Sequence, residues 1–152
     1  GHQLMEKQIT LLIGLPGSGK SDYISKNFNK GEYTVVDDPR KAGDIPLEFA
    51  NHLIIADCHL CREQSMNGFK TFAEKNFPNI PINYIYFENN PEQCFKNASF
   101  RNDGRIVEPT IRHMSKTYNI PEGVTSIPVF NTDTLKNKVK SRLKLWQLFK
   151  KC

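Results

Sequence analysis

"QITLLIGLPGSGKS", residues 8–21, is the stretch that decides the fold this sequence predicts. A short apolar run ends at Gly14, a glycine-rich turn follows, and Lys20 and Ser21 stand where a helix would begin. The turn fits the pattern G-x-x-x-x-G-K-[ST], in which backbone N–H groups converge on phosphate oxygens. In that pattern the lysine adds positive charge beside the β and γ phosphates, and the serine hydroxyl binds Mg²⁺. The stretch therefore predicts a strand, a phosphate-binding loop and a helix, with a nucleoside triphosphate and Mg²⁺ as ligands.

The residues expected to hold the triphosphate come from this loop and from the start of the helix after it. A helix that begins near Gly19 directs the positive end of its dipole at the phosphates. Lys20 is also an expected catalytic residue, and Ser21 is the expected magnesium ligand. The expected triphosphate contacts are Gly14, Pro16, Gly17, Ser18, Gly19, Lys20, Ser21 and Asp22.

Four further apolar runs repeat the form of the first, and stretches with helical spacing or composition separate them. Short continuous apolar runs that alternate with helices are typical of parallel strands covered on both faces. We therefore predict a three-layer α/β fold with a five-stranded parallel sheet, whose expected order in a P-loop NTPase fold is 2-3-1-4-5. The expected strands are 8–14, 33–37, 51–57, 82–88 and 126–131, and the expected helices are 19–28, 62–77, 91–99, 109–118 and 133–150.

Length and composition favour a single cytoplasmic domain. The 152 residues are 38% hydrophobic, which allows one domain with a substantial core. We expect this domain to span residues 5–152, because GHQL at residues 1–4 resembles a remnant of an expression vector. Four cysteines in such a chain do not suggest a disulfide-rich secreted scaffold, so a reducing compartment is expected. No apolar run approaches the roughly 20 residues that span a bilayer, which predicts that no membrane is involved.

The net charge of +5 is concentrated in the C-terminal tail. From Thr132 to Cys152 the chain has seven Lys or Arg and one Asp. Leu135, Val139 and Leu143 recur every four residues, which predicts an amphipathic helix over about 133–150 that packs on the sheet. A basic helix can bind nucleic acid or a membrane surface, and it can equally be the solvated side of a packed helix.

Acidic residues follow the second and third expected strands. Asp37 and Asp38 end one apolar run and Asp57 ends the next, so all three should border the crevice at the carboxyl edge of the sheet. The sequence lacks the N/T-K-x-D and D-x-x-G motifs of GTPases, and Cys58 stands where many motor ATPases carry a second acid. The class that remains is the phosphotransferases, which need a carboxylate beside the acceptor hydroxyl.

Asp37 is the predicted general base among these acids. Adjacent residues of an extended segment point in opposite directions, so only one of Asp37 and Asp38 should face the γ-phosphate. We expect Asp38 to turn toward solvent or toward a structural partner. Arg40 is suited to anchor an anionic group of the acceptor, because a guanidinium binds phosphate through two parallel hydrogen bonds. A solvated turn is the alternative reading of all three residues.

Arg101 and Arg105 flank an Asn-Asp-Gly turn between two helical patterns. A mobile loop with two guanidinium groups would suit closure over a triphosphate, where positive charge stabilises the transition state. We therefore predict a lid over about 100–109, with both arginines in catalysis and Arg101 also in triphosphate binding. Two surface arginines on a connecting loop are the alternative. Asn131, after the last expected strand, is predicted to line the adenine pocket.

Cys58 and Cys61 form a C-x-x-C pair that could bind a metal ion or cycle between thiol and disulfide. A structural zinc site needs four ligands, and the sequence offers no matching second pair. A turn between strand and helix beside Asp57, with His59 near the acceptor, is the simpler interpretation.

These motifs together resemble the P-loop kinases of the phage-type 5′-polynucleotide kinase family. Residues 37–40 match that family's Asp-Asp-x-Arg element, in which the first acid is the general base and the arginine holds the phosphate next to the acceptor end. "IIADCHLCREQ" resembles its strand that ends in an acid, here Asp57, and "RNDGRIVEPTIRHM" resembles its lid and the helix after it. The resemblance covers about residues 8–130. It implies transfer of the γ-phosphate of ATP, bound with Mg²⁺, to the 5′-hydroxyl of DNA or RNA.

One segment departs from the family pattern. Only "KAGDIPLEFA", residues 41–50, separates Arg40 from Asn51, where the family has a longer helical segment that helps to wall the acceptor site. A kinase for a smaller acceptor, such as a nucleoside, nucleotide or sugar derivative, is therefore the first alternative. The second is a protein that binds or hydrolyses ATP and acts through a partner.

Overall fold

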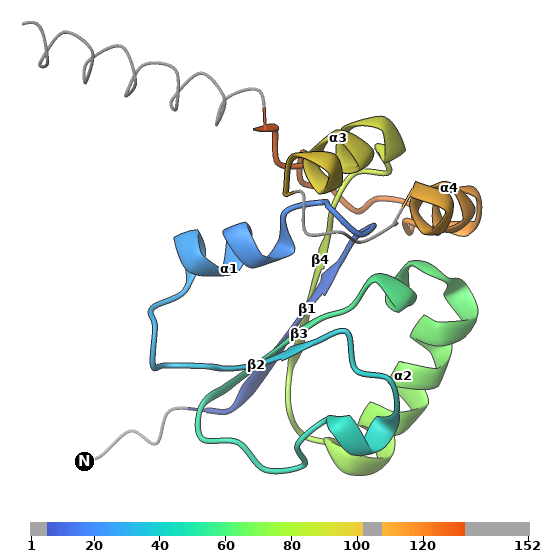
Figure 1. Cartoon of the computed structure of the whole chain (residues 1–152). Helices are drawn as coiled ribbons and strands as arrows, with labels where there is room; N and C mark the ends of the chain where they lie inside the picture. Colours follow the sequence, from blue (N-terminus) through green and yellow to red (C-terminus); the bar gives the residue numbers. More distant parts are fainter. Residues whose placement is uncertain (1–5, 102–107, 133–152) are drawn as a thin grey trace, which may run out of the picture.

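The computed structural model describes residues 6–101 and 108–132, in which strands and helices alternate along the chain (Figure 1). Every strand and helix expected between residues 8 and 118 is present, with ends that differ by at most two residues. The strands are β1 (Gln8–Ile13), β2 (Thr34–Asp37), β3 (His52–Ala56) and β4 (Ile82–Tyr86). The helices are α1 (Lys20–Asn27), α2 (Glu63–Asn76), α3 (Pro91–Arg101) and α4 (Glu108–Thr117), with short 3₁₀ turns η1 (Ala42–Asp44) and η2 (Cys58–Cys61).

The four strands form one parallel sheet in the order β2-β3-β1-β4. β1 is an interior strand that pairs with β3 on one side and with β4 on the other. β2 lies at the edge, where Asp37 is opposite Ala56 of β3. Because all pairs are parallel, the loops that follow the four strands meet at one edge of the sheet.

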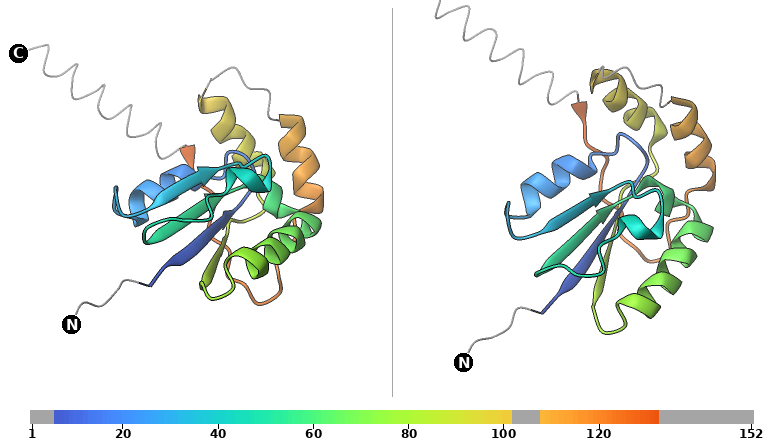
Figure 2. Two further views of the ribbon diagram at one scale, coloured as in Figure 1. Left: turned by 90° about the horizontal axis from the view of Figure 1, so that it is seen from below. Right: turned by 60° about the horizontal axis from the view of Figure 1, so that its bottom comes forward.

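Both sides of the interior strands β1 and β3 are buried, as their continuous apolar runs predict, whereas the edge strands β2 and β4 are partly exposed. Along β1, Leu11 and Ile13 belong to the cluster that includes residues of α2 and α4, whereas Leu12 belongs to the cluster that includes α1. Figure 2 shows α1 and α2 on opposite sides of the sheet. The described chain is therefore an α/β structure with helices on both faces. None of its helices, as far as the structure describes them, has the length and apolar character needed to cross a membrane.

Within the part of the chain that the structure describes, the sheet has four strands, so the prediction of a full fifth strand over 126–131 was wrong in extent. Ile127 forms a single parallel bridge with Phe87 at the edge beyond β4. After this bridge the backbone bonds elsewhere, because the Phe130 N–H donates to the carbonyl oxygen of Ser18 at 3.0 Å. Apart from the bridge at Ile127, the segment does not extend the sheet, and it braces the loop between β1 and α1.

Two expected segments lie largely outside the described residues. The lid over about 100–109 includes residues 102–107, and with them Arg105, whereas Arg101 is the last residue of α3. The basic helix expected over about 133–150 follows Thr132, the last described residue. Both remain predictions.

The burial of His52, at the start of β3, leads to a prediction of how the free energy of unfolding depends on pH. It is 9% exposed, and its Nε2 lies 2.6 Å from the Thr10 hydroxyl on β1. Burial lowers the pKa of His52 below its usual 6.5. The unfolded chain therefore binds this proton more readily, so the free energy of unfolding should fall as the pH drops below about 6.5.

The substitution His52→Gln should make this fall less steep than in the parent protein. Urea unfolding between about pH 8 and pH 5 measures it. His113→Gln, on the exposed side of α4, is the control and should keep more of the parent's slope. If His52→Gln and the parent show parallel pH profiles, His52 is not the group responsible.

Candidate active site

The loop between β1 and α1, residues 14–19, can contain only glycine at two positions. Gly17 and Gly19 have φ values of 84° and 98°, in the left-handed region that side chains disfavour. A Cβ on Gly19 would lie 2.5 Å from the Cβ of Phe130, and a Cβ on Gly17 would clash with the carbonyl oxygen of Cys94 on α3. The loop is thus packed against two later segments of the chain, which fixes the course of its backbone.

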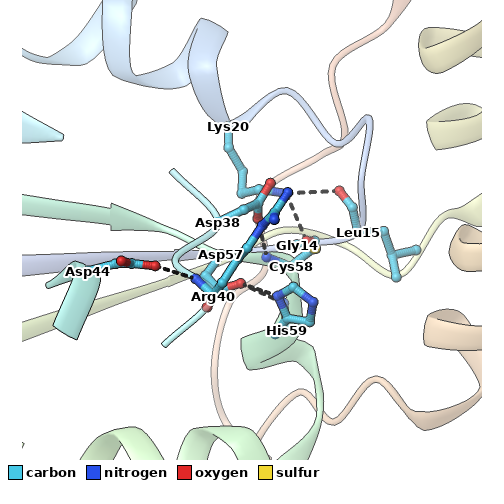
Figure 3. Close-up of polar contacts among 9 residues, drawn as sticks. All are labelled: Gly14, Leu15, Lys20, Asp38, Arg40, Asp44, Asp57, Cys58 and His59. Carbon is cyan, nitrogen blue, oxygen red and sulfur yellow. Dashed lines mark hydrogen bonds and ion pairs between the residues drawn. The ribbon is translucent and has the colours of Figure 1, made fainter. Parts of the chain in front are cut away.

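Lys20 begins α1 and is only 9% exposed. Its Nζ donates to the carbonyl oxygens of Gly14 and Leu15 at 2.8 and 3.0 Å, and to the hydroxyl of Ser18 at 3.3 Å (Figure 3). A buried ammonium needs such acceptors, because an unpaired charge away from water is costly. The positive charge therefore lies inside the curve of the loop, where an oxyanion could take over these hydrogen bonds.

The first turn of α1 adds positive potential at the same place. No side chain caps this helix at Gly19. The first N–H groups of a helix have no acceptor within it, and they attract anions. Ser21 is exposed in this turn. The carboxylate of Asp22, in the same turn, pairs with Lys26 at 3.0 Å.

Asn97 on α3 joins the loop to the segment after the Ile127 bridge, a role that no sequence pattern predicts. It is 3% exposed. Its Nδ2 donates to the carbonyl oxygens of Gly17 and Phe130 at 2.8 and 2.6 Å. Its Oδ1 accepts from the Gln93 side chain at 2.9 Å and from the Thr132 N–H at 3.3 Å. One buried amide thus uses both donors and its acceptor to hold three segments together.

Asp38 lies just past β2, with its side chain in the site (Figure 3). Its N–H donates to the Ala56 carbonyl at 2.8 Å, and its Oδ1 accepts from the Cys58 N–H at 3.2 Å. The expected structural partner is therefore present. Asp38 also has a φ of 46°, in the left-handed region. Neighbouring side chains point in opposite directions only where the backbone is extended. Because Asp38 is not extended, this rule does not predict that its side chain faces away from that of Asp37.

Asp57 follows β3 and is 7% exposed. Its N–H donates to the Leu12 carbonyl at 3.2 Å, which continues the hydrogen bonding between β3 and β1. Its Oδ1 accepts from the His59 N–H at 2.9 Å and lies 2.9 Å from His59 Nδ1 (Figure 3). The sequence placed Asp57 and His59 at this edge, and the structure brings them together beside Asp38.

Potential metal ligands of Asp38, Asp57, Cys58 and His59 all lie within 4.8 Å of one another. Burial, with Asp38 close by, raises the pKa of the Cys58 thiol to about 12. A thiol must lose its proton to bind a metal ion, and burial opposes that loss. Carboxylate oxygens suit Mg²⁺, and the two aspartates are the groups that fit it.

Cys61 and Cys94 are also buried free thiols. Burial raises their pKa values to about 12 and about 11. Buried, protonated thiols are poor nucleophiles. The C-x-x-C pair thus packs the η2 turn, which agrees with the simpler interpretation of that motif.

Asp37 and Arg40 lie on either side of the β2 turn. Asp37 is the exposed last residue of β2, and its role as base stays a prediction. The backbone N–H of Arg40 donates to Asp44 Oδ2 at 3.0 Å, which fixes the turn into η1.

Asn131 is exposed beside Phe130, whose ring lies 5.5 Å from Lys26 Nζ.

No protein-family model matches the chain. The chain is 36% identical over 130 residues to R277, an uncharacterized protein of Acanthamoeba polyphaga mimivirus, and the match covers 76% of this chain and 89% of R277. The crystal structure of APE1195 is similar with a TM-score of 0.50 and 17% identity, over 95% of this chain and 97% of that one. Similarity at that identity concerns the fold alone.

Substitution of Asn97 by leucine should destabilise the protein strongly. The change leaves buried backbone groups of the loop and of Thr132 without partners, each at a cost of about 1–3 kcal/mol. We expect the free energy of unfolding to fall by about 2–4 kcal/mol, measured by urea unfolding. Asn89→Ala is the control, since its exposed amide donates to Ser115 and should cost less than about 0.5 kcal/mol. Similar losses in both variants would contradict the bracing role.

Proposed function

This chain belongs to the same family as the mimivirus protein R277, and we propose that it is an ATP-dependent phosphotransferase with a P-loop NTPase fold. The proposed reaction transfers the γ-phosphate of ATP to a hydroxyl group, with the 5′-hydroxyl of DNA or RNA as the preferred acceptor. The observation that supports this best is the buried Lys20 ammonium inside the loop 14–19, next to the strand ends that carry Asp38 and Asp57.

The proposed triphosphate site consists of the loop, Lys20 and the first turn of α1. The N–H groups of the loop and helix bind the phosphate oxygens, and Lys20 offsets the charge on the β and γ phosphates. Mg²⁺, when bound, would neutralise charge that develops on the triphosphate, and the Ser21 hydroxyl is the proposed ligand. Arg101 and Arg105 are proposed to cover the phosphates, and Asn131 to contact the adenine.

The acceptor hydroxyl is proposed to approach from the side of β2 and β3. Its oxygen forms a bond to the γ-phosphorus, the bond from that phosphorus to the ADP oxygen breaks, and a carboxylate takes the hydroxyl proton. Asp37 is the proposed base, from the resemblance of residues 37–40 to the polynucleotide kinase element. Arg40 and Asp57 are proposed to orient the acceptor.

Hydrolysis of ATP without an acceptor is the less favoured reaction. Motor ATPases often have a second acid after the strand, whereas this chain has Cys58, whose buried thiol stays protonated. A protonated thiol does not polarise water as a carboxylate does. A kinase for a small acceptor is the second candidate, since only residues 41–50 separate Arg40 from the segment that leads into β3.

The proposed function is tested with γ-labelled ATP, Mg²⁺ and a set of acceptors. The set contains single-stranded DNA and RNA with a 5′-hydroxyl, the same strands with a 5′-phosphate, and nucleosides, nucleotides and sugars. We expect label on the 5′-hydroxyl strands and none on the 5′-phosphate controls. Lys20→Ala should abolish the transfer. Label on small acceptors alone would support the second candidate, and free phosphate as the sole product would contradict a kinase.

The substitutions Asp37→Asn and Asp38→Asn separate the base from its neighbour. Asp37→Asn should lower kcat by about 10²-fold or more, because an amide cannot take the hydroxyl proton, and the Kd for ATP should change little. Asp38→Asn keeps an oxygen that can accept from the Cys58 N–H, so a smaller loss is expected. Steady-state kinetics and ATP titration measure both. A larger loss of kcat in Asp38→Asn than in Asp37→Asn would assign the role of base to Asp38. Unchanged kcat in both variants would show that neither acid is the base.

A further inference from the structure

Four side chains with metal-binding atoms meet at the carboxyl edge of the sheet (Figure 3). Asp38 comes from the turn after β2, and Asp57, Cys58 and His59 are consecutive residues where β3 leads into η2. One potential ligand atom from each side chain lies within 4.8 Å of the other three. The sequence contains no second cysteine pair to complete a metal site with Cys58 and Cys61, whereas the structure surrounds Cys58 with ligands of other types.

Backbone hydrogen bonds fix the directions of both carboxylates. Asp38 Oδ1 accepts from the Cys58 N–H at 3.2 Å, and Asp57 Oδ1 accepts from the His59 N–H at 2.9 Å. His59 Nδ1 also lies 2.9 Å from Asp57 Oδ1. Zinc binds nitrogen and oxygen at about 2.0–2.2 Å and sulfur at about 2.3 Å, so the ligand atoms around one zinc ion lie about 3–4 Å apart. The four side chains are therefore close to the geometry of a zinc site, and small rotations would complete it.

The two carboxylates have no lysine or arginine as a direct partner. In the part of the chain that the structure describes, the ion pairs join neither Asp38 nor Asp57 to such a residue. Lys20 directs its ammonium to acceptors of its own loop. Asp57 is 7% exposed and pairs with His59, whose ring is a cation only when protonated and can otherwise bind a metal ion. Buried anions are stabilised by opposite charges or by metal ions, so this place favours a divalent cation.

The ligand types of the whole cluster favour zinc over magnesium. A thiolate and an imidazole suit Zn²⁺, whereas Mg²⁺ prefers oxygen ligands and keeps several waters. Burial, with Asp38 close by, raises the pKa of the Cys58 thiol. A bound dication has the opposite effect, because it stabilises the thiolate, and the thiol proton passes to solvent. The side chain of His59 is 54% exposed, which gives an ion a path from solvent to the buried ligands.

We propose that Asp38, Asp57, Cys58 and His59 bind Zn²⁺, with one atom of each side chain as a ligand. Ser21, the proposed Mg²⁺ ligand, is not part of this set, and zinc binding requires neither ATP nor an acceptor. The inference therefore goes beyond the proposed function and does not depend on it. A bound zinc ion links the turn after β2 to η2, and it occupies the side of the crevice from which the acceptor is proposed to approach.

Titration of the metal-free protein with Zn²⁺, in competition with a chromophoric chelator, measures the affinity. We expect a single zinc ion per chain and a Kd that rises about tenfold or more in His59→Gln and in Cys58→Ser, since even groups outside a ligand set change metal affinity by about 10–100-fold. Cys61→Ala removes the other cysteine of the C-x-x-C pair and should keep the parent's Kd. His113→Gln, on the exposed side of α4, controls for binding at a surface histidine.

Co²⁺ in place of Zn²⁺ reports the ligands directly. A tetrahedral site with a thiolate gives intense d–d bands and a charge-transfer band from sulfur to cobalt, which we expect in the parent and in Cys61→Ala but not in Cys58→Ser. His59→Gln changes a side chain that is more than half exposed, so it tests the site even if Cys58→Ser does not fold.

Four results would overturn the proposal. The parent could bind no zinc, or it could bind Mg²⁺ as tightly as Zn²⁺. His59→Gln and Cys58→Ser could both keep the parent's Kd, which would place the ion elsewhere. Cys61→Ala could lose the ion as Cys58→Ser does, which would assign it to the C-x-x-C pair. Because no assay contains ATP, each result leaves the proposed phosphotransferase function to its own test.

Discussion

The rest of the site depends on the burial of one positive charge, the ammonium of Lys20. At 9% exposure it is stabilised only while its acceptors, Gly14, Leu15 and Ser18, keep their places, so the loop cannot relax without leaving the charge unpaired. The loop is held in turn by β1, an interior strand of the sheet, and by contacts to α3 and Phe130. Asn97 completes this arrangement, because its amide joins the loop to the last described segment. Segments that are far apart in the sequence therefore all help to hold the acceptors of the Lys20 ammonium in place.

Much of the fold could be predicted because a parallel strand that is buried on both faces appears in the sequence as a short continuous apolar run. The runs that became β1 and β3 are apolar on both sides, and the structure buries both sides. The segment 126–131 also contains apolar residues, of which Val129 is buried, yet apolar character does not determine where a backbone N–H bonds. There the Phe130 N–H bonds to Ser18, so the predicted strand became a brace. Asn97 was missed since a polar residue within a helical pattern gives no sign of its burial.

The adjacent acids show a second limit of sequence reasoning. An alternation rule for extended chains predicts that Asp37 and Asp38 face opposite ways. A φ of 46° at Asp38 takes that residue out of the extended region, and the bond from the Cys58 N–H holds its carboxylate at the site. A left-handed aspartate is uncommon, and sequence pattern alone does not reveal it. Two neighbouring acids can therefore serve one crevice here, one as the end of a strand and one as the start of a turn.

The carboxylates past the strand ends differ in what they can still do. Asp57 Oδ1 accepts from the His59 N–H and lies against the His59 ring, and Asp38 Oδ1 accepts from the Cys58 N–H. These hydrogen bonds fix the direction of each carboxylate, which suits orientation of a ligand or a cation better than repeated proton transfer. Both anions also lie at the same edge of the sheet as the buried Lys20, so the crevice contains charge of both signs. An acceptor with a hydroxyl near the acids and a phosphate on Arg40 would match this pattern of charges. A neutral acceptor would have no anionic group to pair with Arg40.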